Sequence, residues 1–454
     1  MDRRLGAIVR RIPHVNAMKI AVIGGGPAGL SAAWRLRERH DVTVFEAAER
    51  AGGAVRSQRI GDYVFDWGPN GFLSGAAGLS RLVRDAGLDG DAVPAVAASK
   101  RYVYWNRRLH DVPLKPPHVL STRLVTPLGK LSALRDVFAR PAADGEDETV
   151  DRFFARHFGP QAAERIVAPA LLGITGGDSK RISVAALFPR VVEMERAHGS
   201  LLRAAMRAGR ATPGVLTSFP GGMQTLSDAL ATGLGTQLRT CAAVAQIIRD
   251  GTGWRVRLND GEEGGFDEVM LATPAYAAAA TVEQFDPELA GLLREIEYVP
   301  MRVAGIAFRR ADVPNALDGF GFLAARGQGV RILGALYTSS LFPAQAPPDV
   351  AYLRVFLGGG VDPQAALCDR DQAETIVRDD LRRVLGIQAA PVAWHDVVWP
   401  RAIPQYAVGH VARVRAVEAR AAAAGGLSLI GNAYRGVGIT DVVRDAFVTA
   451  ERLG

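Results

Sequence analysis

Cysteine is almost absent from this sequence. Only Cys241 and Cys368 occur among 454 residues, which is too few, and too widely spaced, for a disulfide framework or a thiolate metal site. We therefore expect no metal centre and a reducing compartment, the cytoplasm. Aromatic residues are also scarce, at 7%, but 48% hydrophobic and 22% charged residues exclude a disordered chain. The length allows two or three domains.

Long apolar runs and long basic runs are missing as well. No stretch of about 18 apolar residues occurs, so we expect no membrane-spanning helix. The first 17 residues are basic but lack the apolar core of a secretory signal, and Met18 is a candidate for the natural start. The net charge of +7 suits an acidic ligand or an anionic membrane surface. No basic run is interleaved with aromatic residues, so we expect no nucleic-acid partner.

A glycine-rich turn near the start is the most informative segment that is present. An apolar strand runs into Gly24-x-Gly26-x-x-Gly29, and a helix-forming stretch follows. The first glycine permits a tight turn, the second lets the backbone approach a pyrophosphate, and the third lets the helix pack closely. A second strand, 41–45, ends in Glu46, where an acid can bind a ribose hydroxyl. The segment predicts a dinucleotide site.

The residues after Glu46 distinguish between dinucleotides. Arg50 opens the pattern Arg-x-Gly-Gly-x-x-x-Ser, which also contains Gly53 and Arg56 and ends at Ser57. This pattern resembles the second signature of the FAD-dependent amine oxidase and desaturase superfamily, so FAD is favoured over NAD. The alternative, that both arginines are solvated surface charges, stays open. Since neither cysteine lies in a flavin-like motif, we expect the FAD to be bound non-covalently.

The pattern along the chain predicts an α/β fold with separated parts. Strand, glycine turn and helix return at the C-terminus, and Asp250-Gly251 indicates a hairpin. We expect an FAD-binding Rossmann-like domain assembled from three segments, a helical insert that is a candidate membrane-surface domain, and a β-rich substrate-binding domain. The predicted ranges are 18–91, 210–275 and 395–454 for the cofactor domain, 92–209 for the insert, and 276–394 for the substrate domain.

Motifs spread over the whole chain resemble the oxygen-dependent, FAD-containing protoporphyrinogen oxidase family. The C-terminal motif, residues 431–441, is the most specific of them. The others are Gly68-Pro69-Asn70-Gly71, Lys100-Arg101-Tyr102-Val103-Tyr104, Gly173-Ile174-Thr175-Gly176-Gly177-Asp178, Phe219-Pro220-Gly221-Gly222-Met223 and Ile403-Pro404-Gln405-Tyr406.

The resemblance implies which residues contact the cofactor. Glycine-rich backbone before the last helix suits the electron-rich side of a flavin, although an ordinary turn remains an alternative there. Val244 is implied at the adenine end, where it is otherwise a core valine. The implied set is Gly24, Gly25, Gly26, Pro27, Ala28, Gly29, Glu46, Ala47, Gly53, Arg56, Gly68, Pro69, Asn70, Gly71, Val244, Trp399, Asn432, Val437, Gly438 and Ile439.

The resemblance also implies a substrate site for a flat porphyrinogen. Arg101 is its implied propionate-binding cation, although without the family it is an edge-strand charge. Gly173 lets the backbone approach the macrocycle, and Asn70 is placed to meet the substrate. The implied apolar walls, which are otherwise plain sheet core, are Leu323, Leu336 and Phe356. No side chain is assigned as catalytic.

The implied reaction is oxidation of protoporphyrinogen IX to protoporphyrin IX, with oxygen as acceptor and hydrogen peroxide as product. Oxygen is favoured because Gly358-Gly359-Gly360 precedes Pro363, which spoils a second dinucleotide site. Oxidation of coproporphyrinogen III stays open, as do, more remotely, an amine oxidase, a carotenoid desaturase and a non-catalytic binding protein. Peripheral attachment to the cytoplasmic membrane face, an ordinary soluble insert and a homodimer also stay open.

Overall fold

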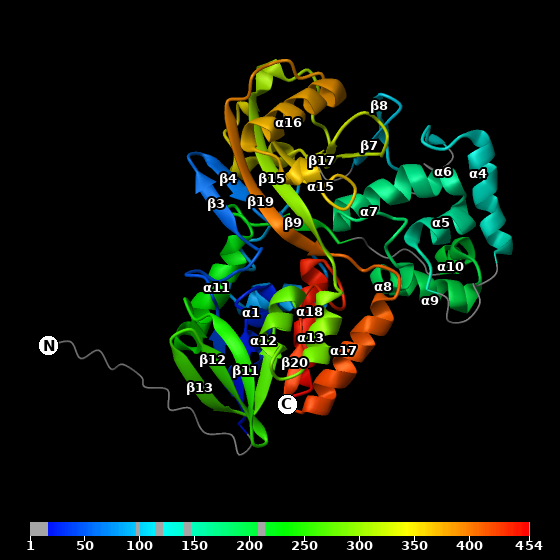
Figure 1. Cartoon of the computed structure of the whole chain (residues 1–454). Coiled ribbons are helices and arrows are strands. Elements are labelled where there is room, and N and C mark those ends of the chain that lie inside the picture. Colours follow the sequence, from blue (N-terminus) through cyan, green and yellow to red (C-terminus); the bar gives the residue numbers. More distant parts are fainter. Residues whose placement is uncertain (1–16, 97–99, 114–120, 140–146, 208–213, 454) are drawn as a thin grey trace.

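The computed structural model describes residues 17–96, 100–113, 121–139, 147–207 and 214–453. Most of the basic leader, residues 1–16, lies outside this part of the chain. Figure 1 shows two sheet regions connected by the long strands β15 and β19, with a group of short helices beside them. The mixed α/β architecture confirms the predicted fold class.

A five-stranded parallel sheet carries the glycine turn. Its strands pair in parallel and come from three distant parts of the chain. The strand order is β10-β2-β1-β14-β20, with β1 Lys19–Ile23, β2 Asp41–Phe45, β10 Leu238–Arg239, β14 Glu268–Leu271 and β20 Leu427–Leu429. A Rossmann-like unit assembled from separated segments is therefore confirmed.

Secondary structure covers both faces of this sheet. One apolar layer joins it to α1 Pro27–Leu36, α2 Ala77–Asp85, α11 Gln224–Leu234 and α18 Ile439–Glu451. The opposite layer joins it to α12 Ala275–Val282, α13 Pro287–Arg294, α17 His410–Ala424 and the antiparallel strands β11 Val244–Asp250, β12 Gly253–Leu258 and β13 Gly261–Phe266. The predicted hairpin at Asp250-Gly251 is confirmed, because Asp250 pairs with Gly253 and Gly251 has φ +60°.

The second large sheet has seven strands and two very different faces. Its neighbours pair antiparallel except for β16 and β7. The order is β19-β15-β18-β17-β16-β7-β8, with β7 Tyr102–Trp105, β8 Arg108–Asp111, β15 Tyr298–Arg309, β16 Gly321–Ala324, β17 Ile332–Leu336, β18 Val350–Gly358 and β19 Ala393–Pro404. The closed face packs against α16 Arg370–Leu385. We call the opposite side, which carries Arg354 and Phe356, the open face.

Short helices form a third region, held together by a buried polar cluster. Asp136 accepts hydrogen bonds from Ser200 Oγ and Leu202 N, both at 2.7 Å, and contacts His157. His157 Nε2 lies 3.1 Å from a carboxylate oxygen of Glu195. The helices are α4 Pro127–Leu134, α5 Val150–Phe158, α6 Pro160–Ala162, α7 Ala168–Thr175, α8 Val184–Leu187, α9 Pro189–His198 and α10 Leu201–Arg207. No helix in the described ranges is both long and apolar enough to cross a bilayer.

Strand pairing crosses two of the predicted domain boundaries. β7 and β8 fall inside the predicted insert, 92–209, but pair within the seven-stranded sheet. β19 passes through residue 395 and stays in that sheet to Pro404. Hydrogen-bonded pairing depends on spatial neighbours rather than on chain order, so a local composition change does not locate such a boundary. We propose that the insert begins after Asp111 and that the last cofactor segment begins after Pro404.

Smaller elements connect these regions. β3 and β4 form a two-stranded sheet next to the second glycine loop, and β9 pairs with both β5 and β6. Their bounds are β3 Ser57–Ile60, β4 Tyr63–Asp66, β5 Phe72–Leu73, β6 Val93–Pro94, β9 Leu216–Ser218, α14 Thr338–Leu341 and α15 Pro363–Leu367.

Candidate functional site

The glycine turn between β1 and α1 is tightly closed on one side and open on the other. Gly24 N–H donates to Phe45 O at 2.8 Å, and a Cβ at Gly29 would lie only 2.0 Å from Gly24 O. A Cβ at Gly26 would meet nothing within 4 Å, and no side chain caps α1, which begins at Pro27. The amides at the start of α1 thus face free space, which fits a pyrophosphate.

Glu46 lies directly beside this turn. One of its carboxylate oxygens accepts a hydrogen bond from Gly25 N at 2.7 Å, and a Cβ at Gly25 would lie 2.9 Å from the same oxygen. Ala242 N donates to Glu46 O at 2.8 Å, which brings the start of β11, where Val244 lies, next to Glu46. A fixed carboxylate at the end of β2 fits a ribose hydroxyl donor.

The second glycine loop folds back over the first. Gly52 N donates to Gly25 O at 2.8 Å. Gly53 has φ +54°, and a Cβ there would lie 3.2 Å from the Gly26 Cα. The positive φ and this close approach favour glycine at position 53. The two loops therefore form one continuous cradle, although a helix and a strand separate them in the sequence.

The loop that begins at Gly68 connects this cradle to the seven-stranded sheet. A Cβ at Gly68 would lie 1.9 Å from Ala54 O, so the loop packs against the second glycine loop. Trp399 Nε1, on β19, donates to Trp67 O at 3.0 Å. The Arg56 guanidinium lies 5.1 Å from the centre of the Trp67 ring. The remaining loop residues, all half-buried, are Pro69, Asn70 and Gly71.

The C-terminal glycine turn lies against the start of α1. A Cβ at Gly431 would be 4.0 Å from the Ala28 Cβ. The Tyr406 hydroxyl donates to Asn432 O at 2.6 Å and accepts from Gly436 N at 2.9 Å. Burial raises the pKa of Tyr406, so this hydroxyl keeps its proton. The turn is thus fixed from both ends.

The last helix presents a free N-terminus at this turn. α18 begins at Ile439, and no side chain caps it at Gly438. Val437 is half-buried just before it. Unpaired amides and the positive end of the helix dipole fit an electron-rich ring edge. Three backbone segments of distant origin, at α1, the second loop and α18, therefore fit a flavin dinucleotide. Ala47 is exposed beside Glu46, at the adenine end.

The predicted substrate residues share the open face of the seven-stranded sheet. Leu336 pairs with Arg354 on one side and with Gly321 on the other. Gly334 likewise pairs with both Phe356 and Leu323. Residues opposite each other on neighbouring strands point to the same face. The three predicted apolar walls therefore lie together, and each is half-buried: Leu323, Leu336 and Phe356.

Gly173 and Arg101 border this face. A Cβ at Gly173, on α7, would lie 2.6 Å from Leu323 Cδ2, so α7 packs directly against this wall of the sheet. Arg101 precedes Tyr102, which pairs with Phe322 on β16. Its side chain is exposed and lies 4.8 Å from the centre of the Phe320 ring. Desolvation by the surrounding protein lowers the pKa of Arg101. The Arg101 guanidinium forms no salt bridge with any residue in the described ranges.

Arg354 is a candidate site residue that our sequence reasoning missed. It is 3% exposed in the middle of β18, and one of its terminal amino groups donates to Gly68 O. Nε and Nη1 have no hydrogen-bond partner among the described residues. A charged residue inside the apolar run 350–357 was the signal in the sequence. It was ambiguous, because an arginine in a strand is usually at an exposed edge.

Comparisons with known proteins agree with this geometry. The model of the flavin-containing amine oxidoreductase family matches residues 27–454. The chain belongs to this family. It is therefore an oxidoreductase, and FAD is its cofactor, as the sequence predicts. Both the enzyme class and the cofactor prediction are confirmed.

Two curated relatives show where the chain lies within that family. It is 28% identical over 465 residues to protoporphyrinogen oxidase 1 of Spinacia oleracea, with 94% of this chain and 83% of the relative covered. It is also 28% identical over 464 residues to the coproporphyrinogen III oxidase of Staphylococcus aureus, with 96% and 98% covered. The predicted resemblance is confirmed.

A solved structure shows the same fold. This is a protein from Exiguobacterium sp. 255-15 that has been assigned as a protoporphyrinogen oxidase. The TM-score is 0.82 at 24% identity, with 97% of this chain and 99% of the other covered. The segments that surround the open face therefore belong to one shared architecture.

Proposed function

We propose that this protein oxidises a porphyrinogen to the corresponding porphyrin in heme biosynthesis, with FAD as the immediate oxidant and oxygen as the final acceptor. The observation that carries the proposal is the open face, an apolar surface bordered by arginine and next to the loop that begins at Gly68. A flat macrocycle with carboxylate substituents matches that combination of an apolar floor and cations.

The protein's part in this reaction is positioning and electrostatics. When bound, FAD would supply the hydride-accepting chemistry of each oxidation step. Arg101 binds a substrate carboxylate, and the half-buried walls Leu336 and Phe356 hold the macrocycle flat. The glycine-rich backbone holds the cofactor against this face. Three rounds remove six hydrogens from the porphyrinogen, and three oxygen molecules become three hydrogen peroxide molecules. No side-chain base is needed by this scheme.

Oxygen is the proposed acceptor because the described chain offers no second dinucleotide site. The run that begins at Gly358 has its backbone amides engaged: Gly359 N donates to Pro300 O at 2.8 Å and Gly360 N to Gly176 O at 2.7 Å. The following helix, α15, has only 5 residues. These amides are not free to bind a pyrophosphate.

Two porphyrinogens are candidate substrates. The sequence reasoning favoured protoporphyrinogen IX, and relatives named for protoporphyrinogen and for coproporphyrinogen III support one candidate each. Arg354 is a specific observation in favour of the second candidate, because a further buried cation suits a substrate with more carboxylates.

One assay tests the proposal. FAD-replete protein is given either porphyrinogen in air, and porphyrin fluorescence, product mass and hydrogen peroxide are followed. We expect porphyrin formation with about one peroxide for each pair of hydrogens removed. A yellow, FAD-replete protein that oxidises neither porphyrinogen under air would refute the proposal, and turnover of a simple amine instead would move the activity to amine oxidation.

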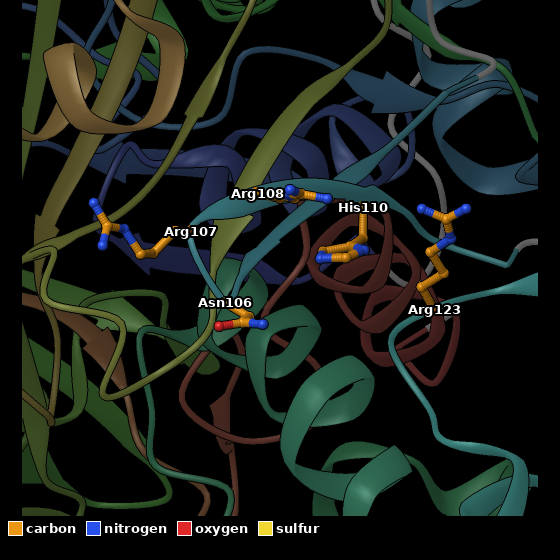
Figure 2. Close-up of a pocket in the computed structure, with 5 residues that line it drawn as sticks. All are labelled: Asn106, Arg107, Arg108, His110 and Arg123. Atoms are coloured by element: carbon orange, nitrogen blue, oxygen red, sulfur yellow. The ribbon is translucent and has the colours of Figure 1, made fainter.

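We also propose that the helical region attaches to an anionic membrane surface. α4 and the turn after it expose four large apolar side chains with no described cover: Leu128, Leu131, Leu134 and Phe138. Arg123, which precedes α4, and the β7–β8 hairpin line a pocket whose described lining residues include three arginines and no acidic residue, as Figure 2 shows. An apolar helix face beside a cationic pocket fits acyl chains and lipid phosphates respectively.

Vesicle flotation tests this attachment. We expect the protein to float with vesicles that contain anionic lipid at low salt, and Leu131→Glu to remain at the bottom. Leu367→Glu, at an exposed leucine outside this region, is the matched control and should float like the unaltered protein. Equal flotation of both variants, or none with anionic vesicles at low salt, would exclude this surface.

A further inference from the structure

Two arginines stand at opposite ends of one row across the open face. The register runs from Arg354 on β18 to Leu336 on β17 and Gly321 on β16. Arg101 is the next position in this row, because the residue after it pairs with the residue after Gly321. Neighbouring strands are about 4.8 Å apart, so the two arginine backbones lie roughly 14 Å apart. Between them the floor carries only a leucine and a glycine.

Arg354 has unused hydrogen-bonding capacity. Its guanidinium is buried, yet Nε and Nη1 find no acceptor in the described structure. Asp66 acts on it electrostatically but forms no hydrogen bond with it in the described structure, and Oδ1 of Asp66 accepts hydrogen bonds from Ser57 Oγ at 2.5 Å and Met223 N at 3.0 Å. A buried charged donor without an acceptor is unfavourable. An anionic ligand at this point would remove that cost.

We infer that Arg354 is a second carboxylate-binding cation of the substrate site, so that the preferred porphyrinogen carries carboxylates on opposite edges. This inference rests on the proposed function. Arg101 binds the carboxylate at the outer edge of the face, and Arg354 binds one at the inner edge, next to Gly68. Arg354 is thus a specificity residue.

The two candidate substrates differ in the groups that they would place next to Arg354, so the inference distinguishes between them. Coproporphyrinogen III carries a propionate on every pyrrole, so its opposite edges are both anionic. Protoporphyrinogen IX carries propionates on two neighbouring pyrroles and vinyl groups on the other two. With one propionate edge at Arg101, a vinyl edge would face Arg354 and leave its Nε and Nη1 without an acceptor and shut off from water. The site therefore selects the tetracarboxylate.

Kinetics of Arg354→Met test this with both porphyrinogens and FAD-replete protein. We expect the KM for coproporphyrinogen III to rise at least about tenfold, as for the loss of one partner of a buried charge pair. The KM for protoporphyrinogen IX should change less than about threefold, because its vinyl edge makes no ion pair. Arg354→Lys should recover part of the loss, since it keeps the charge without the planar fork.

Arg331→Met is the matched control. Arg331 precedes β17 and pairs with Asp362, at 2.8 Å, outside the open face. We expect both KM values to remain unchanged in this variant. The flavin absorbance spectrum and the FAD-to-protein ratio should also be unaltered in Arg354→Met, which distinguishes a substrate contact from a cofactor contact. Thermal unfolding shows whether each variant is folded, and Arg354→Lys provides the comparison if the methionine variant is not.

A binding measurement separates this inference from the proposed function. Fluorescence titration with coproporphyrin, which needs no turnover, should give at least about tenfold weaker binding to Arg354→Met than to the unaltered protein. Equal losses for both porphyrinogens, or a shifted flavin spectrum with unchanged KM and binding, would overturn the inference and leave the reaction intact. Absence of turnover with either porphyrinogen by the unaltered protein would overturn the proposed function itself.

Discussion

The two faces of the seven-stranded sheet are built from the same strands but are completed differently. On the closed face, alternate residues such as Phe322, Ala335 and Val355 are buried against α16. On the open face, their sequence neighbours Leu323, Leu336 and Phe356 are only half-buried. Strand alternation produces both sets, so the difference lies in what covers them. The chain itself completes the closed face, whereas on the open face it leaves the area around these three side chains only partly covered.

Two buried arginines, one on each face, also differ in how completely the chain pairs them. Arg302 lies on the closed face, where its nitrogens are paired with Asp396 and with the carbonyls of Ala366 and Cys368. Arg354 lies one strand away on the open face, with two nitrogens unpaired. Each is 3% exposed. The two arginines are equally buried but unequally paired. Burial by itself therefore does not distinguish an arginine that stabilises the fold from one that is available to bind a ligand.

The largest effect expected concerns the cofactor next to the open face. Gly26→Val puts a side chain into the free space at the start of α1, where the pyrophosphate backbone contact is needed. We expect folded, colourless protein with an FAD-to-protein ratio below about one tenth of normal. Gly261→Val, at an exposed strand glycine whose Cβ would also meet nothing, is the control and should stay yellow. Stoichiometric FAD in a folded Gly26→Val protein would contradict the assignment of this turn.

Substitution of each buried arginine by methionine tests whether Arg302 and Arg354 differ in their contribution to stability. Arg302→Met leaves the nearly buried Asp396 with only the longer contact to Arg370, at 3.8 Å, so the free energy of unfolding should fall by about 3 to 5 kcal/mol. Arg354→Met removes a buried charge whose Nε and Nη1 have no acceptor among the described residues, and it loses only the bond to Gly68 O and the attraction of Asp66, so without substrate it should cost less stability than Arg302→Met. Urea unfolding of both variants measures this. A larger loss of stability for Arg354→Met than for Arg302→Met would show that Arg354 is part of the folded scaffold.

The apolar residues sharpen the same comparison. Leu357 is 0% exposed on the closed face, so Leu357→Ala should lower the free energy of unfolding by about 2 to 5 kcal/mol. Leu336 is half-buried on the open face, so Leu336→Ala should cost about 1 kcal/mol or less in the substrate-free protein. Chemical denaturation of the pair is the measurement. Similar losses would mean that both faces are ordinary core.

At the exposed edge of the open face we expect an effect on substrate binding alone. Arg101→Ala should raise the KM for the preferred porphyrinogen about tenfold, which corresponds to about 1.4 kcal/mol. Since the carboxylate contact is similar in ground and transition states, kcat should change less. Arg101→Lys should recover part of the loss, and flavin content should remain normal. Unchanged KM and kcat in Arg101→Ala would leave Arg101 as a solvated charge.

Much of the fold could be predicted from residues that are close together in the sequence. The strand-turn-helix at Gly24, the hairpin at Asp250-Gly251 and the closing strand and helix each depend on neighbours within a few residues. Domain boundaries were harder to predict. β7 and β8 lie within the range predicted as the helical insert, and only the pairing of β7 with β16 places them in the large sheet.

The sequence by itself determined the cofactor turn of this protein, because φ preferences and missing Cβ atoms at Gly24, Gly26 and Gly29 act over a few residues. Only the tertiary structure decided the open face. The position of Arg354 opposite Arg101 depends on the register of four strands, β18, β17, β16 and β7. Whether Nε and Nη1 of Arg354 find an acceptor depends on which residues pack around them. Register and packing are set jointly by segments hundreds of residues apart, so no local pattern records them.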